Sequence, residues 1–106
     1  MIVRISSVIV PQARLQPYLE NVQSVEIPVY QAADGMVSVW LLVRTTVGYA
    51  EVRTVSLWRT EEELERFLQK QLSASAGDGE GVIAVEVRNY DLYFSGLGEH
   101  QQELPK

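Results

Sequence analysis

The chain has 106 residues, of which 46% are hydrophobic, and its formal net charge is −5. This length supports one domain with one modest core, and the hydrophobic content excludes a fully disordered chain. Its nine basic residues are scattered along the sequence, which argues against nucleic-acid binding because that function needs clustered positive charge.

Residue content also bears on location and on metal sites. No apolar run approaches the roughly 20 residues of a membrane span. The chain contains no cysteine, so disulfides, thiolate chemistry and cysteine metal sites are excluded. The first residues lack a basic segment followed by a long apolar one. We therefore expect no secretory signal and a cytoplasmic protein without a membrane segment.

The first third of the chain reads as a strand followed by a helix. Residues 1–10 alternate as a strand does, and Pro11 stops the pattern. Apolar residues then recur at steps of three and four over residues 15–30, which predicts a helix with one buried stripe. Pro28 should kink or end that helix, so irregularity is expected over residues 26–30.

A hairpin is predicted in the middle of the chain. Residues 36–46 form a strongly apolar strand, and residues 49–58 form a second strand that ends on a tryptophan. Gly48 lies in the short link between the two strands, where it suits a tight reversal. So short a link predicts that the two strands pair in the antiparallel sense.

A capped helix follows the hairpin. Thr60 is followed three residues later by Glu63, which is the spacing of a capping box at the start of a helix over residues 61–72. Residues 73–81 are small, polar and rich in glycine, which is typical of a loop. Residues 82–94 return to a strand pattern.

The order strand, helix, strand, strand, helix, strand predicts the α+β class and a ferredoxin-like fold. This fold has a four-stranded antiparallel sheet with two helices on one face. We expect a single domain over residues 1–94 and a polar tail over residues 95–106.

The first strand of the hairpin is apolar on both sides, which predicts a partner for the uncovered sheet face. One side is expected to carry Val37, Val39, Leu41 and Val43, and the opposite side Met36, Trp40 and Leu42. A strand that is apolar on both faces is buried on both faces. A lone domain of this kind has nothing to cover its open sheet, so we expect a homodimer in which two such sheets pack together.

Two short motifs carry a resemblance to a known family. They are the strand end Val55-Ser56-Leu57-Trp58 with the helix start Thr60-Glu61-Glu62-Glu63, and the turn Asp34-Gly35-Met36. Together with the order of elements, they make residues 1–94 resemble the antibiotic-biosynthesis-monooxygenase-like domains of the dimeric α+β barrel superfamily. The resemblance is more specific for the fold than for the chemistry, because the superfamily hosts many activities.

The resemblance implies a reaction and a pocket. Enzymes of this family oxidise phenolic or quinol-type polycyclic substrates with molecular oxygen, without a metal or a flavin, in a pocket between the helices and the sheet. This chain would then be a cofactor-independent monooxygenase that acts on an electron-rich aromatic or quinol-type small molecule. Trp58 would be the family's tryptophan, while Thr54 and Ser56 stand on the strand face where quinone-forming members carry an asparagine.

A haem-degrading branch of the same family fits less well. That branch uses an asparagine on the first strand, the same tryptophan and a histidine on the second helix. Here Ser7 lies near the first of these positions, and the helix predicted over residues 61–72 contains no histidine. The only histidine is His100, in the predicted tail. Haem degradation by that mechanism is therefore not expected.

The candidate pocket residues each have a simpler structural role as an alternative. Trp58 could stack on an aromatic substrate, or it could be a packing residue of the core. Ser7, Thr54 and Ser56 are expected to face the helices, where one of them could hold a substrate oxygen. Buried hydroxyls also commonly bond to nearby backbone groups.

Arg88 is the charged candidate. It could stabilise an enolate or phenolate anion, as electrostatic catalysis requires. Glu86 lies two residues earlier on the same strand face, so the pair could equally be an ion pair at the surface or in an interface.

Two further functions stay open on the sequence. One is a non-catalytic dimeric domain of the same fold that binds a small ligand or serves in a stress response, which the missing histidine and the altered asparagine position favour. The other is an interaction module that uses its apolar sheet face to hold a different protein.

Overall fold

The computed structural model describes residues 1–74 and 81–98 of the chain. In chain order, the strands and α-helices are β1 (Ile2–Pro11), α1 (Leu15–Asn21), α2 (Ile27–Gln31), β2 (Met36–Thr46), β3 (Tyr49–Trp58), α3 (Glu61–Ala74) and β4 (Ile83–Asp91). No helix within these two ranges is long and apolar enough to cross a membrane.

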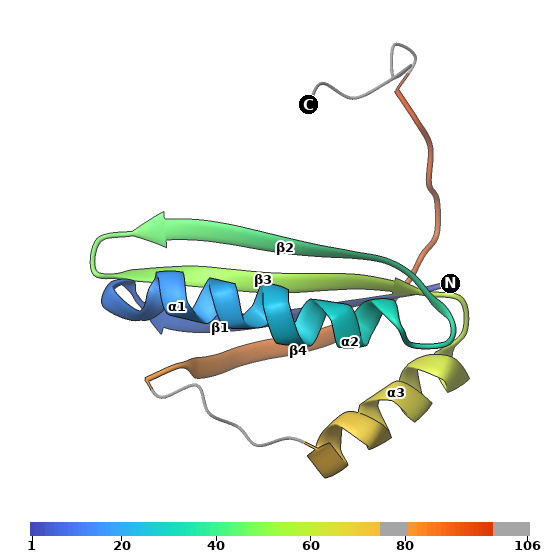
Figure 1. The fold of residues 1–106 in the computed structure, drawn as a ribbon. Coiled ribbons are helices and arrows are strands. Elements are labelled where there is room, and N and C mark those ends of the chain that lie inside the picture. Colours follow the sequence, from blue (N-terminus) through green and yellow to red (C-terminus); the bar gives the residue numbers. More distant parts are fainter. Residues whose placement is uncertain (75–80, 99–106) are drawn as a thin grey trace.

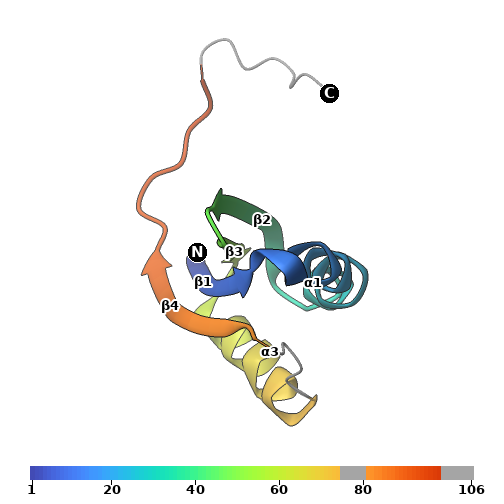
Figure 2. The same cartoon turned by 90° about the vertical axis from the view of Figure 1, so that its left-hand side faces the viewer.

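The strands form one four-stranded sheet in the order β2-β3-β1-β4, and every neighbouring pair is antiparallel. The helices lie on one side of this curved sheet, with α1 and α2 running along it and α3 set at one end (Figures 1 and 2). This arrangement confirms the predicted α+β, ferredoxin-like fold. We call the side covered by the helices the helix face and the other side the open face.

The strand boundaries differ from the prediction mainly in β4. Strands β2 and β3 span the predicted residues, whereas β4 ends at Asp91 rather than at residue 94. The N–H of Leu92 still donates to the carbonyl oxygen of Met1, at 2.9 Å. Beyond it, the chain to residue 98 leaves the body of the domain (Figure 1), and the rest of the predicted tail lies outside the described residues.

The first helix is irregular one turn earlier than predicted. It continues through Pro28 to the end of α2, and the irregularity is a π-helical segment, η2 (Val22–Glu26). The N–H of Ile27 bonds to the carbonyl oxygen of Val22, five residues back. Proline has no N–H, and its ring crowds the carbonyl four residues before it, so a widened turn lets the helix pass Pro28 without a break.

The predicted Thr60 cap is present at the start of α3, although the Glu63 carboxylate meets the Thr60 hydroxyl in place of the Thr60 N–H that a full capping box uses. The N–H of Glu63 donates to the Thr60 hydroxyl at 3.1 Å, and the Thr60 hydroxyl lies 3.1 Å from a carboxylate oxygen of Glu63. Helix α3 runs to Ala74, two residues beyond the prediction. Of the loop predicted after it, residues 75–80 lie outside the described residues.

Buried core residues occur along β1, η2 and β3, at Val10, Val22, Ala50 and Val52. One cluster of the core lies between α2, α3 and the end of β3. Its buried members are Trp58, Leu64 and Phe67, and Met36 packs against them. The β2–β3 register shifts between Met36 and Ser38, which places Met36 beside Trp58 on the helix face. The prediction that Met36 shares a side with Trp40 is therefore wrong, because strict alternation cannot anticipate a bulge.

Candidate functional site

The pairing of β1 with β3 sorts the predicted site residues onto two faces of the sheet. Thr54, Ser56 and Trp58 alternate along β3 on the helix face, where Trp58 packs against α3. Ser7 lies directly opposite Arg53, and Ser6 is the residue that lies opposite Thr54. Directly opposed residues share a face. The expectation that Ser7 faces the helices is therefore wrong, and Ser7 belongs to the open face.

Trp58 is a buried residue of the core. Its indole N–H donates to the hydroxyl oxygen of Ser56 at 2.9 Å, and both side chains are buried. The Trp58 ring centroid lies 4.9 Å from that of Phe67 and 6.4 Å from that of Tyr30. The polar edge and the faces of the indole are thus engaged within the protein.

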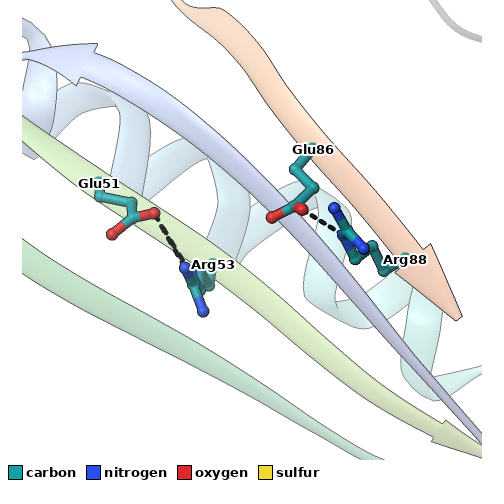
Figure 3. A network of polar contacts seen from close by, with 4 residues as sticks. All are labelled: Glu51, Arg53, Glu86 and Arg88. Atoms are coloured by element: carbon teal, nitrogen blue, oxygen red, sulfur yellow. Dashed lines mark hydrogen bonds and ion pairs between the residues drawn. The ribbon is translucent and has the colours of Figure 1, made fainter. Parts of the chain in front are cut away.

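Arg88 also lies on the open face. Its pairing partner on β1 is Ile5, two residues from Ser7, and Glu86 pairs with Ser7 itself. Arg88 forms an exposed ion pair with Glu86, whose hydrogen bond and charge raise the pKa of Arg88. Figure 3 shows this pair on β4 and a second pair, Glu51–Arg53 at 3.2 Å, on β3.

Ser7 sits between these two ion pairs. Across the strands its neighbours are Arg53 on one side and Glu86 on the other. The Ser7 side chain is buried, and its hydroxyl oxygen has no hydrogen-bond partner in the described part of the chain. The predicted residues therefore do not surround one pocket, because Ser7 and Arg88 are separated by the sheet from Thr54, Ser56 and Trp58.

The helix face carries a group of polar residues, of which only Thr54 and Ser56 were expected from the sequence. Arg4 on β1 lies between Ser56 on β3 and Asn89 on β4, and Ser6 lies next to Thr54 in the following row. We call Arg4, Ser6, Thr54, Ser56 and Asn89 the polar patch. The next row consists of Val8, Val52 and Ala84, so the patch is bordered by apolar residues on that side.

Tyr30 of α2 lies within electrostatic reach of the polar patch. Burial raises the pKa of Tyr30, the positive charge of Arg4 offsets part of that rise, and Glu26 adds to it. The Tyr30 phenol therefore stays protonated at neutral pH, so it can donate a hydrogen bond but is not available as a base. A guanidinium and a neutral phenol together form a suitable environment for a substrate oxyanion.

The described residues offer little for a metal ion. Nowhere in residues 1–74 and 81–98 do three histidine, cysteine, aspartate or glutamate side chains gather in a group that could hold one.

Comparison with known proteins supports the fold. No protein-family model matches the chain, and no curated protein is similar to it in sequence. A presumed antibiotic biosynthesis monooxygenase from Bacillus cereus is 17% identical, with a TM-score of 0.71 over 94% of this chain and 98% of that one. The heme-degrader MhuD from Mycobacterium tuberculosis, solved with two hemes in its active site, is 19% identical, with a TM-score of 0.64 over 91% and 99% of the two chains.

The de novo designed protein Foldit4 is similar to nearly the same extent. It is 17% identical, with a TM-score of 0.62 over 87% of this chain and 98% of that one. A designed sequence thus has the same architecture as the natural proteins. At these sequence identities, structural similarity is evidence for the fold but not for the activity. The chain has the fold of the antibiotic-biosynthesis-monooxygenase-like proteins.

Proposed function

We propose that the chain is a cofactor-independent monooxygenase that oxidises an electron-rich phenolic or quinol-type small molecule. The substrate binds on the helix face of the sheet, with its oxygen at Arg4. The placement of Arg4 between Ser56 and Asn89, within reach of the protonated Tyr30, carries this proposal. The likeness in fold to a presumed monooxygenase supports it.

The proposed role of Arg4 is to stabilise the substrate anion. A positive charge beside a phenol or enol favours its deprotonated form, which is the form that gives electrons to oxygen. Tyr30 holds its own proton, so the substrate proton leaves to water. With anthrone as the substrate, one atom of O2 becomes the new ring carbonyl, the other leaves as water with the two hydrogens of the ring CH2, and anthrone supplies all the electrons.

Trp58 acts indirectly in this proposal. Because it is buried, it does not stack on the substrate, but its N–H fixes the Ser56 hydroxyl next to Arg4. Trp58 and Ser56 are thus positioning residues for the patch, while Thr54 and Ser6 lie in the neighbouring row of the sheet.

Oxygen uptake with anthrone tests the proposal. Two variants are compared, one that removes an arginine from the helix face and one that removes an arginine from the open face. The wild type should form anthraquinone faster than the uncatalysed reaction. Arg4→Met should lower kcat/KM by about tenfold to a hundredfold, the range expected for loss of a charged hydrogen bond. Arg88→Met removes the same charge from the open face and should change kcat/KM by less than about twofold. Equal losses in the two variants would contradict a site at Arg4.

Ligand binding without turnover is the second candidate function. Two observations favour it. Trp58 is packed against Phe67 and so is not available to a substrate, and Tyr30 is protonated and so is not available as a base. This second function predicts that 4-nitro-1-naphthol, a phenol ionised at neutral pH, binds in a manner that depends on Arg4. It also predicts that no oxygen is consumed with anthrone above the uncatalysed rate.

A further inference from the structure

A groove between α2 and α3 lies apart from the polar patch. Its volume is about 330 Å3, at the lower end of the range of about 300–1,000 Å3 that is typical of small-molecule sites. It is lined by Val29, Ala32, Ala33, Asp34, Glu63, Arg66, Phe67, Lys70 and Gln71. All of these residues come from the two helices and the turn after α2, and none comes from the sheet.

The apolar part of the groove is formed by Val29, Ala32, Ala33 and Phe67. Val29 is 42% exposed, although it is a large apolar residue on a helix. Phe67 is almost fully buried and joins the groove to the core, where it packs against Trp58. An apolar body lying in the groove would cover Val29 and contact the edge of the core.

The acidic side chains of the groove are already engaged. Arg59 donates to a carboxylate oxygen of Glu63 at 2.6 Å, and this hydrogen bond is the main cause that lowers the pKa of Glu63. Asp34 lies within electrostatic reach of the same guanidinium. Arg59 therefore balances much of the negative charge at this end of the groove.

The basic side chains are less compensated. Arg66 and Lys70 are four residues apart on α3, so they lie on the same helical face, one turn from each other. Neither has an ion-pair partner among the residues that the structure describes, although the charge of Arg66 acts on Glu63. The two side chains leave positive charge at the edge of an apolar groove, which is the arrangement that suits an anion with an apolar body.

We propose that this groove binds a small amphipathic anion. The apolar body lies against Val29 and Phe67, and a carboxylate meets Arg66 and Lys70. This proposal does not rest on the reaction proposed at Arg4, because the two sites share no residue, although Phe67 of the groove contacts Tyr30 and Trp58.

Three probes with the same ten-carbon chain test the charge preference of the full-length protein by isothermal titration calorimetry. The proposal predicts that decanoate binds most tightly, that decanol binds more weakly, and that decyltrimethylammonium does not bind. Equal affinity for decanoate and decanol, or no binding of any probe, would overturn the proposal.

Variants locate the site. Lys70→Glu and Arg66→Glu should each weaken decanoate binding by about fivefold, the range expected for an exposed ion pair, and leave decanol unchanged. Ala32→Trp, at an exposed position in the groove, should abolish the binding of both probes while the circular dichroism spectrum stays that of the wild type.

Arg44→Glu is the control for net charge. It makes the same charge reversal on β2, at an exposed residue that does not line this groove. It should leave decanoate binding within about twofold of wild type. If it weakens binding as much as Lys70→Glu, the protein's overall charge governs affinity and the proposed site is wrong.

Discussion

At the scale of single residues, the face of the sheet on which a side chain lies decides its role. The sequence correctly placed Trp58 at the end of a strand and put Arg88 and Glu86 on a shared face. It could not show that Ser6 and not Ser7 lies beside Thr54, because alternation defines two faces without saying which one the helices cover. Arg4 was missed because a charged residue on a strand is ordinarily expected to face solvent.

The hydrogen bond between Trp58 and Ser56 gives a stability prediction at this scale. Ser56→Ala leaves the buried indole N–H without its acceptor, so the free energy of unfolding should fall by about 1–3 kcal/mol. Urea unfolding followed by tryptophan fluorescence measures the change. Ser24→Ala removes an exposed hydroxyl and should change the same quantity by less than about 0.5 kcal/mol. An equally small effect at Ser56 would mean that the Trp58 N–H finds another acceptor.

At the scale of elements, the sequence predicted what depends on local spacing and missed what depends on distant contacts. The cap formed by Thr60 and Glu63 was predictable because both partners are close in sequence. The contact between Gly35 and Glu63 was not, because it joins the turn before β2 to α3. Gly35 has φ +86°, and a methyl group there would overlap the Glu63 side chain, so glycine serves both the turn and the approach of α3.

Substitution of Gly35 tests that contact. Gly35→Ala should lower the free energy of unfolding by at least about 1 kcal/mol, because L-residues disfavour this backbone conformation and the helix start must move. Gly48→Ala is the matched control, since Gly48 has φ +88° but nothing near it that a methyl group would meet. Thermal unfolding of the two variants separates the cost of the backbone conformation from the cost of the overlap with Glu63. Equal losses would show that the contact with Glu63 adds nothing to the backbone cost.

The ion pair between Arg59 and Glu63 predicts a pH dependence. The hydrogen bond from Arg59 holds the pKa of Glu63 below its ordinary value of 4.5. A carboxylate with a lowered pKa stabilises the folded state above its unfolded pKa, and this contribution is lost as the pH falls through the folded pKa. Glu63→Gln keeps a residue that can complete the capping box but removes the charge.

The wild type should therefore exceed Glu63→Gln in unfolding free energy at pH 6, and the difference should vanish as the pH falls well below 4.5. Denaturant unfolding at a series of pH values measures it. A difference that does not vary with pH would assign the effect of the substitution to packing and not to the ion pair.

At the scale of the whole molecule, the order of elements was predictable from sequence periodicity, and the assembly stays a proposal. The open face shows Trp40 and Leu42 at 47% and 49% exposure, and it also holds the Ser7 hydroxyl, which has no hydrogen-bond partner among the described residues. These features support the homodimer that the apolar hairpin predicts. A different protein partner would need the same surface, so purified chain in solution distinguishes the two possibilities.

Sedimentation velocity tests this assembly. The wild type should sediment as a species with twice the 12.0 kDa mass of the chain. Leu42→Lys should shift it to the monomer, because burying an unpaired charge in a sheet interface is costly. Val47→Lys adds the same charge at the fully exposed hairpin tip and should leave the dimer intact. A wild-type monomer at all concentrations would favour a hetero-partner.

Binding of a stable phenolate tests, without depending on turnover, whether the proposed functional site lies on the helix face of the sheet at Arg4. Isothermal titration calorimetry with 4-nitro-1-naphthol compares the wild type with Arg4→Met and Arg88→Met. Affinity should fall by about tenfold or more in Arg4→Met and stay at the wild-type level in Arg88→Met. Wild-type affinity in Arg4→Met, with the loss in Arg88→Met instead, would contradict the proposed site and place the ligand on the open face.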